Sequence, residues 1–234
     1  MQPQQIPLTL GPRDRACFAA FHPGPNRQAL ACLEHYVTVL GLPGVYLYGA
    51  ADTGKSHLLA AACQAAAERG LAAVYLPLGE GLPHRALEGL ESLALICLDD
   101  LQAIAGHRAW ERALLELLER LPLEGTGLVM AGLTVPARME IGEELRARLA
   151  QTVMVGLQPV DEAGRLAVLR HRARRRSLML PSEVERYLAR RFASLSRLMA
   201  ALGVLERATL AAQRRPTLPF IRTVLQEAGM EGEG

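Results

Sequence analysis

The segment that most constrains the fold is Gly49-Ala-Ala-Asp-Thr-Gly54-Lys55-Ser56, which places two glycines, a lysine and a hydroxyl side chain at fixed spacing. Before it, Val45-Tyr-Leu-Tyr48 predicts a buried strand, and after it the Ala-rich run from Ser56 to Arg69 predicts a helix that ends at Gly70. A loop between a strand and a helix N-terminus turns backbone N–H groups and the positive end of the helix dipole toward an anion. The sequence therefore predicts an α/β fold with an anion site at this loop.

These eight residues match the phosphate-binding pattern G-x-x-x-x-G-K-[ST]. Only one of the 26 basic residues is a lysine, Lys55, and it stands in the motif, so a chance match is on the order of one in a thousand. Glycines allow the backbone to approach phosphates closely, Lys55 supplies a positive charge to them, and the Ser56 hydroxyl can bind Mg²⁺. The predicted cofactor is ADP or ATP with Mg²⁺. The residues predicted to bind it are Gly49, Ala50, Ala51, Asp52, Thr53, Gly54, Lys55 and Ser56.

A second apolar run, Leu93-Ala-Leu-Ile-Cys-Leu98, is followed directly by Asp99-Asp100. A continuous apolar run is typical of a parallel strand that is buried on both faces. With the phosphate-binding loop about 40 residues upstream, two acids at a strand end form a Walker B pattern, in which Asp99 binds Mg²⁺ directly or through water and Asp100 orients an attacking water. The alternative is an acidic turn after a strand, because Asp is common at such positions.

The rest of the chain divides into an alternating part and a helical part. Helices are predicted at 26–40, 107–121 and 138–150, and strands at 72–78, 127–132 and 153–157. From Asp161 onward, helical periodicity occupies 161–176, 182–192, 194–214 and 217–229. We predict a parallel sheet covered by helices, followed by a small all-helical domain. The predicted boundaries are a flexible N-terminal segment at 1–12, an α/β nucleotide-binding domain at 13–158 and a helical lid domain at 159–234.

Composition argues against several other classes of protein. The formal net charge is +2 and 21% of the residues are charged, which does not fit a generally polybasic nucleic-acid binder. No apolar run reaches the roughly 18–20 residues of a membrane-spanning helix, and the N-terminus lacks the pattern of a secretory signal. The four cysteines are scattered without metal-ligand spacing. We therefore expect a cytoplasmic protein that does not associate with membranes.

Several sequence blocks resemble one family. Val45-Tyr-Leu-Tyr-Gly and Gly54-Lys-Ser-His57-Leu resemble the strand, P-loop and GK[ST]HL block of AAA+ initiators and helicase loaders of the DnaA clade, and Asp99-Asp100 is similar to their Walker B ending. Glu144-Leu-Arg146-Ala-Arg148-Leu is similar to the block that carries the family's arginine finger, and Ser194-Leu-Ser-Arg197-Leu to the start of the lid helix that carries its sensor 2 arginine. The resemblance spans nearly the whole chain. It implies an AAA+ fold with a lid, and it adds His57 and Arg197 to the nucleotide-binding residues.

The two arginines have different expected roles. Arg148 would reach the γ-phosphate of a nucleotide held by a neighbouring subunit, a contribution of about 10³–10⁵ in rate where such arginines have been measured. Arg197 would close over this chain's own nucleotide. The family usually has a polar sensor 1 residue where this chain has Leu133. We therefore expect weak or no ATPase activity of its own, and activation of hydrolysis on a partner.

The N-terminal Gln5-Ile6-Pro7-Leu8-Thr9-Leu10 resembles the Q-x-x-L-x-L peptide that attaches proteins to the replication sliding clamp through Gln5, Leu8 and Leu10. The chain ends soon after the fourth lid helix, so we expect no helix-turn-helix domain for DNA. This combination resembles the Hda-type regulatory inactivators of DnaA. The resemblance implies a negative regulator of replication initiation whose partners are DnaA, the clamp, DNA mainly through the clamp, and a second copy in a homodimer.

Two other functions remain open from the sequence. One is an autonomous ATPase such as a helicase loader, and the other is a passive clamp-binding adaptor that uses nucleotide only for stability. The basic run from Arg170 to Arg176 is also open to two interpretations, a solvated lid helix or a local contact with DNA or an acidic partner.

Overall fold

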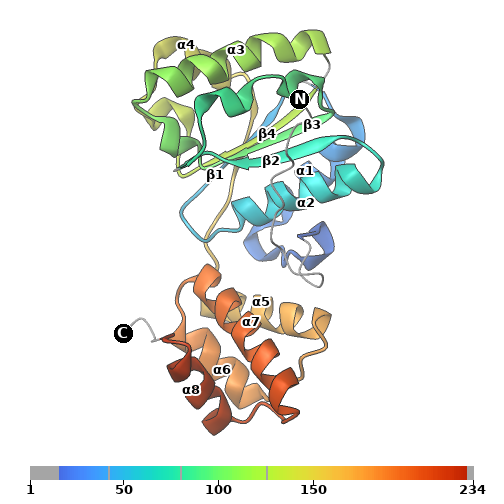
Figure 1. Cartoon of the computed structure of the whole chain (residues 1–234), viewed down its shortest axis with the longest axis vertical. Coiled ribbons are helices and arrows are strands. Elements are labelled where there is room, and N and C mark those ends of the chain that lie inside the picture. The colour runs from blue at the N-terminus through green and yellow to red at the C-terminus, as the bar shows by residue number, and fades with distance from the viewer. Residues whose placement is uncertain (1–15, 42, 80, 125, 231–234) are drawn as a thin grey trace.

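The computed structural model describes residues 16–41, 43–79, 81–124 and 126–230 of the 234-residue chain. They form an α/β part, in which helices cover both faces of a sheet, and a helical part below it (Figure 1). The predicted clamp-binding residues Gln5, Leu8 and Leu10 lie outside the described ranges. None of the helices in those ranges has the length and apolar character needed to span a bilayer.

The sheet has five parallel strands in the order β2-β3-β4-β1-β5. They are β1 (Val45–Tyr48), β2 (Ala73–Pro77), β3 (Leu95–Asp99), β4 (Gly127–Gly132) and β5 (Val153–Gly156). Because all strands run in the same direction, their carboxyl ends meet at one edge. The P-loop after β1, the acids after β3 and Leu133 after β4 are thereby brought to the same edge, where open α/β sheets bind ligands. The predicted parallel sheet is confirmed.

Helices cover both faces of the sheet because alternate strand residues point to opposite sides. Tyr46, Ile96 and Met130 pack on the face covered by α3 (Arg108–Glu124) and α4 (Glu143–Leu149). Their neighbours in the strands pack on the face covered by α1 (Arg27–Val39) and α2 (Lys55–Glu68) (Figure 1). The central strands are therefore buried on both faces, as their continuous apolar sequences predicted.

The helix expected at 138–150 is shorter than predicted. Pro136 begins the short 3₁₀ turn η6 (Pro136–Arg138), and Met139 then adopts an extended backbone with ψ of 145°. Gly142 is the N-cap of α4, so the helix begins only at Glu143. The apolar residues before it still contribute to the core, because Met139 and Ile141 are buried from an extended segment.

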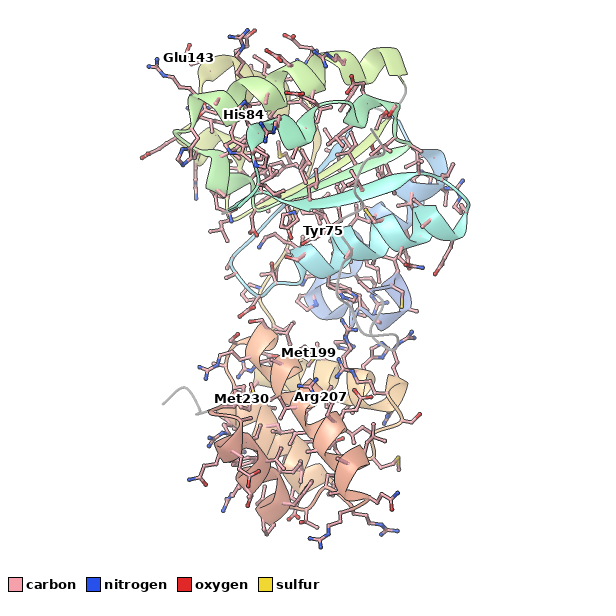
Figure 2. All side chains as sticks on the ribbon, in the orientation of Figure 1. Tyr75, His84, Glu143, Met199, Arg207 and Met230 are labelled. Atoms are coloured by element: carbon pink, nitrogen blue, oxygen red, sulfur yellow. The ribbon has the colours of Figure 1, made fainter. Side chains whose placement is uncertain are left out.

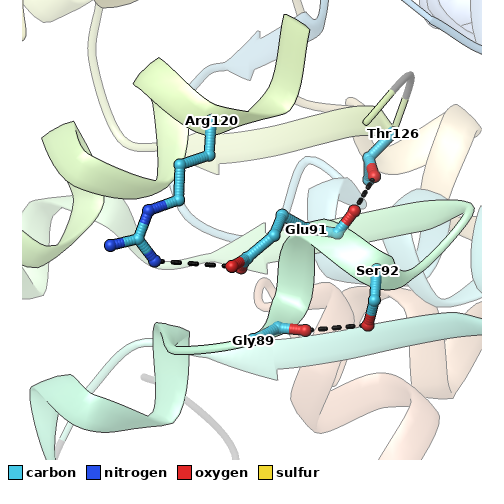
Figure 3. Close-up of polar contacts among 5 residues, drawn as sticks. All are labelled: Gly89, Glu91, Ser92, Arg120 and Thr126. Carbon is cyan, nitrogen blue, oxygen red and sulfur yellow. Dashed lines mark hydrogen bonds and ion pairs between the residues drawn. The ribbon is translucent and has the colours of Figure 1, made fainter. Parts of the chain in front are cut away.

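Short 3₁₀ turns occur before α1, between β2 and β3, and between β3 and α3. They are η1 (Phe18–Ala20), η2 (Gly24–Asn26), η3 (His84–Leu87), η4 (Leu90–Ser92) and η5 (Leu101–Ile104). Figure 3 shows how η4 is held: the buried Thr126 hydroxyl lies 2.7 Å from the Glu91 carbonyl, and the Glu91 side chain pairs with Arg120 of α3 at 3.4 Å. Ser92 closes the turn through its 2.9 Å bond to the Gly89 carbonyl. These contacts fix the approach to β3, and hence the position of the acids at its end.

The helical part consists of α5 (Glu162–Arg175), α6 (Ser182–Arg191), α7 (Leu195–Ala212) and α8 (Leu218–Glu227). Their apolar faces form a separate core around Leu169, Leu188, Phe192 and Leu202. Each predicted lid helix is present, with ends within two residues of the prediction. The predicted domain boundary between residues 158 and 159 falls in the connection from β5 to α5.

Candidate nucleotide-binding site

The loop from Gly49 to Ser56 follows β1 and leads into α2. Gly54 is the N-cap of α2 and has a φ of 94°. In this left-handed conformation a residue with a side chain would be strained. A Cβ at Gly54 would lie 2.7 Å from Cε2 of Phe21, and one at Gly49 would lie 2.4 Å from the Leu157 carbonyl oxygen. The two motif glycines are therefore required by close contacts as well as by the turn.

Lys55 is 8% exposed and folds back over its own loop. Its ammonium donates to the carbonyls of Gly49 at 2.8 Å and Ala50 at 2.7 Å. Burial lowers the pKa of Lys55, while the carboxylates of Asp99, Asp100 and Asp52 act in the opposite direction. A cation held by weak neutral acceptors at a helix N-terminus suits an anionic ligand.

Asp99 and Asp100 stand in different environments. Asp99 is 1% exposed; its Oδ2 accepts the Tyr75 hydroxyl at 2.8 Å and its Oδ1 accepts the Asp100 N–H at 2.9 Å. Asp100 is exposed, with φ of 56°, and its Oδ1 accepts the Gln102 amide at 2.8 Å. Gln102 also accepts the N–H of Leu133 at 3.1 Å, so it ties Asp100 to the end of β4. The side chain of Leu133, at the predicted sensor 1 position, is apolar and 46% exposed.

A cavity of about 230 Å³ opens beside the P-loop. The loop, the η1–η2 segment, α5 and α7 together form its wall, and Figure 2 shows Met199 on the side of the lid that faces the α/β part. The lining residues are Ala20, Phe21, His22, Asn26, Asp52, Thr53, Gly54, Lys55, Ser56, His57, Val160, Val168, Arg172, Leu195, Ser196 and Met199. A larger hollow of about 680 Å³ lies between α3 and η3, and no P-loop residue lines it. The smaller cavity is the one that combines apolar walls with phosphate-binding groups, so we take it as the candidate site.

His57 links the P-loop helix α2 to Cys17, just before η1, and to the lid. Its Nδ1 accepts the Arg172 guanidinium at 2.8 Å, so its Nε2 carries the proton and donates to the Cys17 carbonyl at 3.1 Å. The ring stacks on Phe21 with centroids 6.0 Å apart. Burial, followed by the charge of Arg172, lowers the pKa of His57 to about 4. His57 is therefore a neutral connector at one wall of the cavity.

Two further contacts lie beside the cavity, and the first of them holds the lid against the P-loop. Asp52 accepts the Ser194 hydroxyl at 2.5 Å and the Ser196 N–H at 3.3 Å, at the start of α7. The buried Asn26 side chain both donates to and accepts from the backbone of Gln158, at 2.9 and 2.7 Å. Asp52 thus links the P-loop to the start of α7, and Asn26 links the turn before α1 to the connection between β5 and α5.

The two arginines with expected catalytic or sensor roles lie apart. Arg197 is on α7, with its guanidinium 5.9 Å from the centre of the Phe192 ring, and it does not line the cavity. Arg148 is on α4, half-buried and also away from this chain's cavity. Its neighbour Arg146 donates to the carbonyls of Met139 at 3.3 Å and Ile141 at 2.8 Å. Within the described ranges, no residue forms a hydrogen bond or ion pair with the Arg148 side chain.

The basic run from Arg170 to Arg176 is less exposed than its interpretation as a solvated lid helix assumed. Arg170 pairs with Glu185 at 2.7 Å, Arg176 pairs with Glu206 at 3.3 Å, and His171 donates to the Ala19 carbonyl at 2.8 Å. Arg172 contacts His57, as described above. Only Arg174 and Arg175 of the run are exposed. Most of these side chains therefore form contacts within the lid, or between the lid and the α/β part.

Sequence reasoning missed Tyr75, Gln102 and Asn26. A polar residue inside the predicted strand 72–78, an amide two residues after the Walker B acids and an Asn at a helix start were the available signals. Each residue acts through a partner that is distant in sequence or lies on another strand, and single-sequence patterns do not show such pairs.

Comparisons with known proteins agree with this architecture. A family model for the Hda lid domain matches residues 161–225. Domain III of the replication initiation protein DnaA from Thermotoga maritima superposes with a TM-score of 0.76 at 21% identity, covering 91% of this chain and 96% of that chain. AMPPCP-bound DnaA from Aquifex aeolicus gives 0.69 at 22% identity, over 82% of this chain and 65% of that one. The RuvB Holliday junction branch migration motor from Thermotoga maritima gives 0.61 at 14% identity, over 88% and 69%.

The sheet order, the P-loop and the appended helices are those of the AAA+ fold, as predicted. More specifically, its α/β part has the DnaA-like fold and its lid matches the Hda lid domain.

Proposed function

We propose that this chain is a negative regulator of chromosomal replication initiation. It stimulates hydrolysis of the ATP held by the initiator DnaA while docked on the DNA-loaded sliding clamp, and Arg148 acts in trans. The observation that carries the proposal is an Hda-type lid on a DnaA-like ATPase fold. The protein works in the cytoplasm as a homodimer, and it contacts DNA mainly through the clamp.

The chain's own site takes ADP or ATP with Mg²⁺. Lys55 and the loop N–H groups suit the phosphates, while the Ser56 hydroxyl and the Asp99 carboxylate are the hard oxygen ligands that Mg²⁺ prefers. The fit also rests on Asp99 being a buried carboxylate near a buried lysine. DnaA structures with a similar fold are bound to AMPPCP. When bound, Mg²⁺ would neutralise phosphate charge, and this chain's residues would orient the nucleotide.

Of the two arginines on α4, Arg148 is the better candidate for the arginine finger. The guanidinium of Arg146 donates hydrogen bonds to two backbone carbonyls, so its removal would disturb the fold. Arg148 is half-buried and lies outside its own chain's cavity, which suits a nucleotide held by another subunit. A guanidinium placed there stabilises charge that develops on the transferred phosphoryl group.

The residue that follows β4 supports weak ATP hydrolysis by the chain itself. Leu133 offers an apolar side chain where a polar group would contact the γ-phosphate, and one oxygen of Asp100 is engaged by Gln102. The nucleotide then serves mainly to hold the lid and the α/β part together. Attachment to the clamp is assigned to Gln5, Leu8 and Leu10 on their sequence pattern.

The test is conversion of radiolabelled ATP on DnaA to ADP, in the presence of this protein, ADP and DNA-loaded clamp. We expect Arg148→Ala to bind clamp and DnaA normally and to lose at least about 100-fold of the stimulated rate. Arg112→Ala is the matched control, because Arg112 is an exposed arginine of α3 paired only with Glu116 among the residues described. Full stimulation by Arg148→Ala would favour the passive adaptor, whereas rapid ATP turnover by the isolated chain would favour the helicase loader.

A further inference from the structure

Tyr75 of β2 lies beside Asp99, one of the two residues predicted to bind Mg²⁺. In the β2–β3 register it pairs with Cys97, which is two residues before Asp99. Residues two apart in a strand point to the same face, and paired residues share that face. Tyr75, Cys97 and Asp99 therefore all point toward α2, the helix that contains Ser56. Figure 2 places Tyr75 between β2 and α2.

The Tyr75 hydroxyl holds the predicted metal-binding carboxylate. It donates to Asp99 Oδ2 at 2.8 Å. A phenol carries a single donor, and here that donor is given to the carboxylate across the β2–β3 pairing. The orientation of the Asp99 side chain therefore depends on a residue of the neighbouring strand.

Asp99 has little freedom to choose another orientation. It is almost fully buried, its second oxygen is held by the Asp100 N–H, and the β2–β3 pairing fixes both strands. Each carboxylate oxygen accepts about two hydrogen bonds or ligands. One position on each oxygen is used by the protein, so further positions remain for a cation or its bound water.

We propose that Tyr75 is a positioning residue for magnesium in the nucleotide site: its hydroxyl fixes the orientation of the Asp99 carboxylate. The proposal rests on the nucleotide binding proposed above and concerns the metal dependence of that binding. Removing groups that hydrogen-bond metal ligands commonly lowers metal affinity by about 10–100-fold. Tyr75 itself does not touch the metal.

The test measures the affinity for mant-ADP, a fluorescent ADP, with Mg²⁺ and with EDTA. We expect Tyr75→Phe to bind mant-ADP in EDTA as the wild type does, because the loop and Lys55 are unchanged. In a magnesium titration, the Mg²⁺ concentration for half-maximal tightening should rise about tenfold. Tyr48→Phe is the matched control, since it removes a hydroxyl from the same sheet, and it should leave both affinities unchanged.

A second variant separates metal positioning from packing. Asp99→Asn should also weaken the effect of Mg²⁺, and adding Tyr75→Phe to it should cause little further loss, because the hydroxyl acts through that carboxylate. An unchanged magnesium titration of Tyr75→Phe, an equal loss of affinity with and without Mg²⁺, or additive losses in the double variant would overturn the proposal. If the wild type binds mant-ADP in neither condition, the proposed nucleotide site itself fails.

Discussion

Protonation of His57 should weaken the junction between the P-loop helix and the lid. The neutral ring accepts Arg172 on one nitrogen and donates to Cys17 from the other. A proton on Nδ1 would replace the acceptor with a donor and place a positive charge against the guanidinium. Lowering the pH is therefore a perturbation aimed at this one contact.

The size of the effect follows from the pKa of His57, which burial and Arg172 lower from 6.5 to about 4. In the unfolded chain the imidazole takes up its proton near pH 6.5, whereas in the folded chain it does so only near pH 4. The stabilising contribution is complete above pH 6.5 and is lost as the pH falls toward 4. At about 1.4 kcal/mol per pH unit, we expect a loss of about 2 kcal/mol between pH 7.5 and 5, and of about 3 kcal/mol in total.

Urea unfolding followed by circular dichroism at pH 7.5 and 5 measures this loss. His57→Gln is the reference, because the amide can donate to Cys17 and accept from Arg172 but does not titrate in this range. All other ionisable groups are the same in both proteins, so the difference between the two pH-dependent losses of unfolding free energy isolates His57. An equal loss of unfolding free energy in wild type and His57→Gln would refute the reasoning.

Two further predictions concern the same region. Asn26→Ala removes both bonds to the Gln158 backbone from a buried site, and we expect it to lower the free energy of unfolding by about 2–3 kcal/mol in urea; a loss below about 0.5 kcal/mol would contradict this account. Gly54→Ala should weaken mant-ADP binding at least about tenfold, because its Cβ would collide with Phe21. Gly70→Ala has a similar positive φ of 74° but open space around it, so it should cost about 1 kcal/mol of stability and leave the affinity unchanged.

The parts of the site that the sequence could predict are those formed by residues close together in the chain. The P-loop spacing and the acids after an apolar run each depend on a single strand and its following turn, so local patterns were sufficient. The lid helices were predicted for the same reason. Their apolar periodicity is strong, and Asp161 and Ser194 cap helix starts in the structure, as residues of their type commonly do.

The parts that sequence could not predict depend on contacts between distant segments. Asn26 and Gln158 are 132 residues apart, and Tyr75 and Asp99 are on different strands. The same limit applies to α4, where the periodicity of 138–150 was that of a helix but Pro136 and Gly142 gave the first residues an extended backbone. The roles of Arg148, Arg197 and the clamp-binding residues stay predictions, since they depend on a bound nucleotide or on partner proteins.

Lys55 is the one lysine among the 26 basic residues of this chain, and it lies in the cavity wall. The protein therefore has one side-chain amine, and that amine is at the phosphate-binding loop. Burial lowers its pKa and so increases the fraction that is neutral and nucleophilic. An amine-directed reagent would thus label a single lysine side chain, and a bound nucleotide would shield it. The unusual preference for arginine makes occupancy of the site readable by mass spectrometry, in a mixture with other proteins and without a fluorescent analogue.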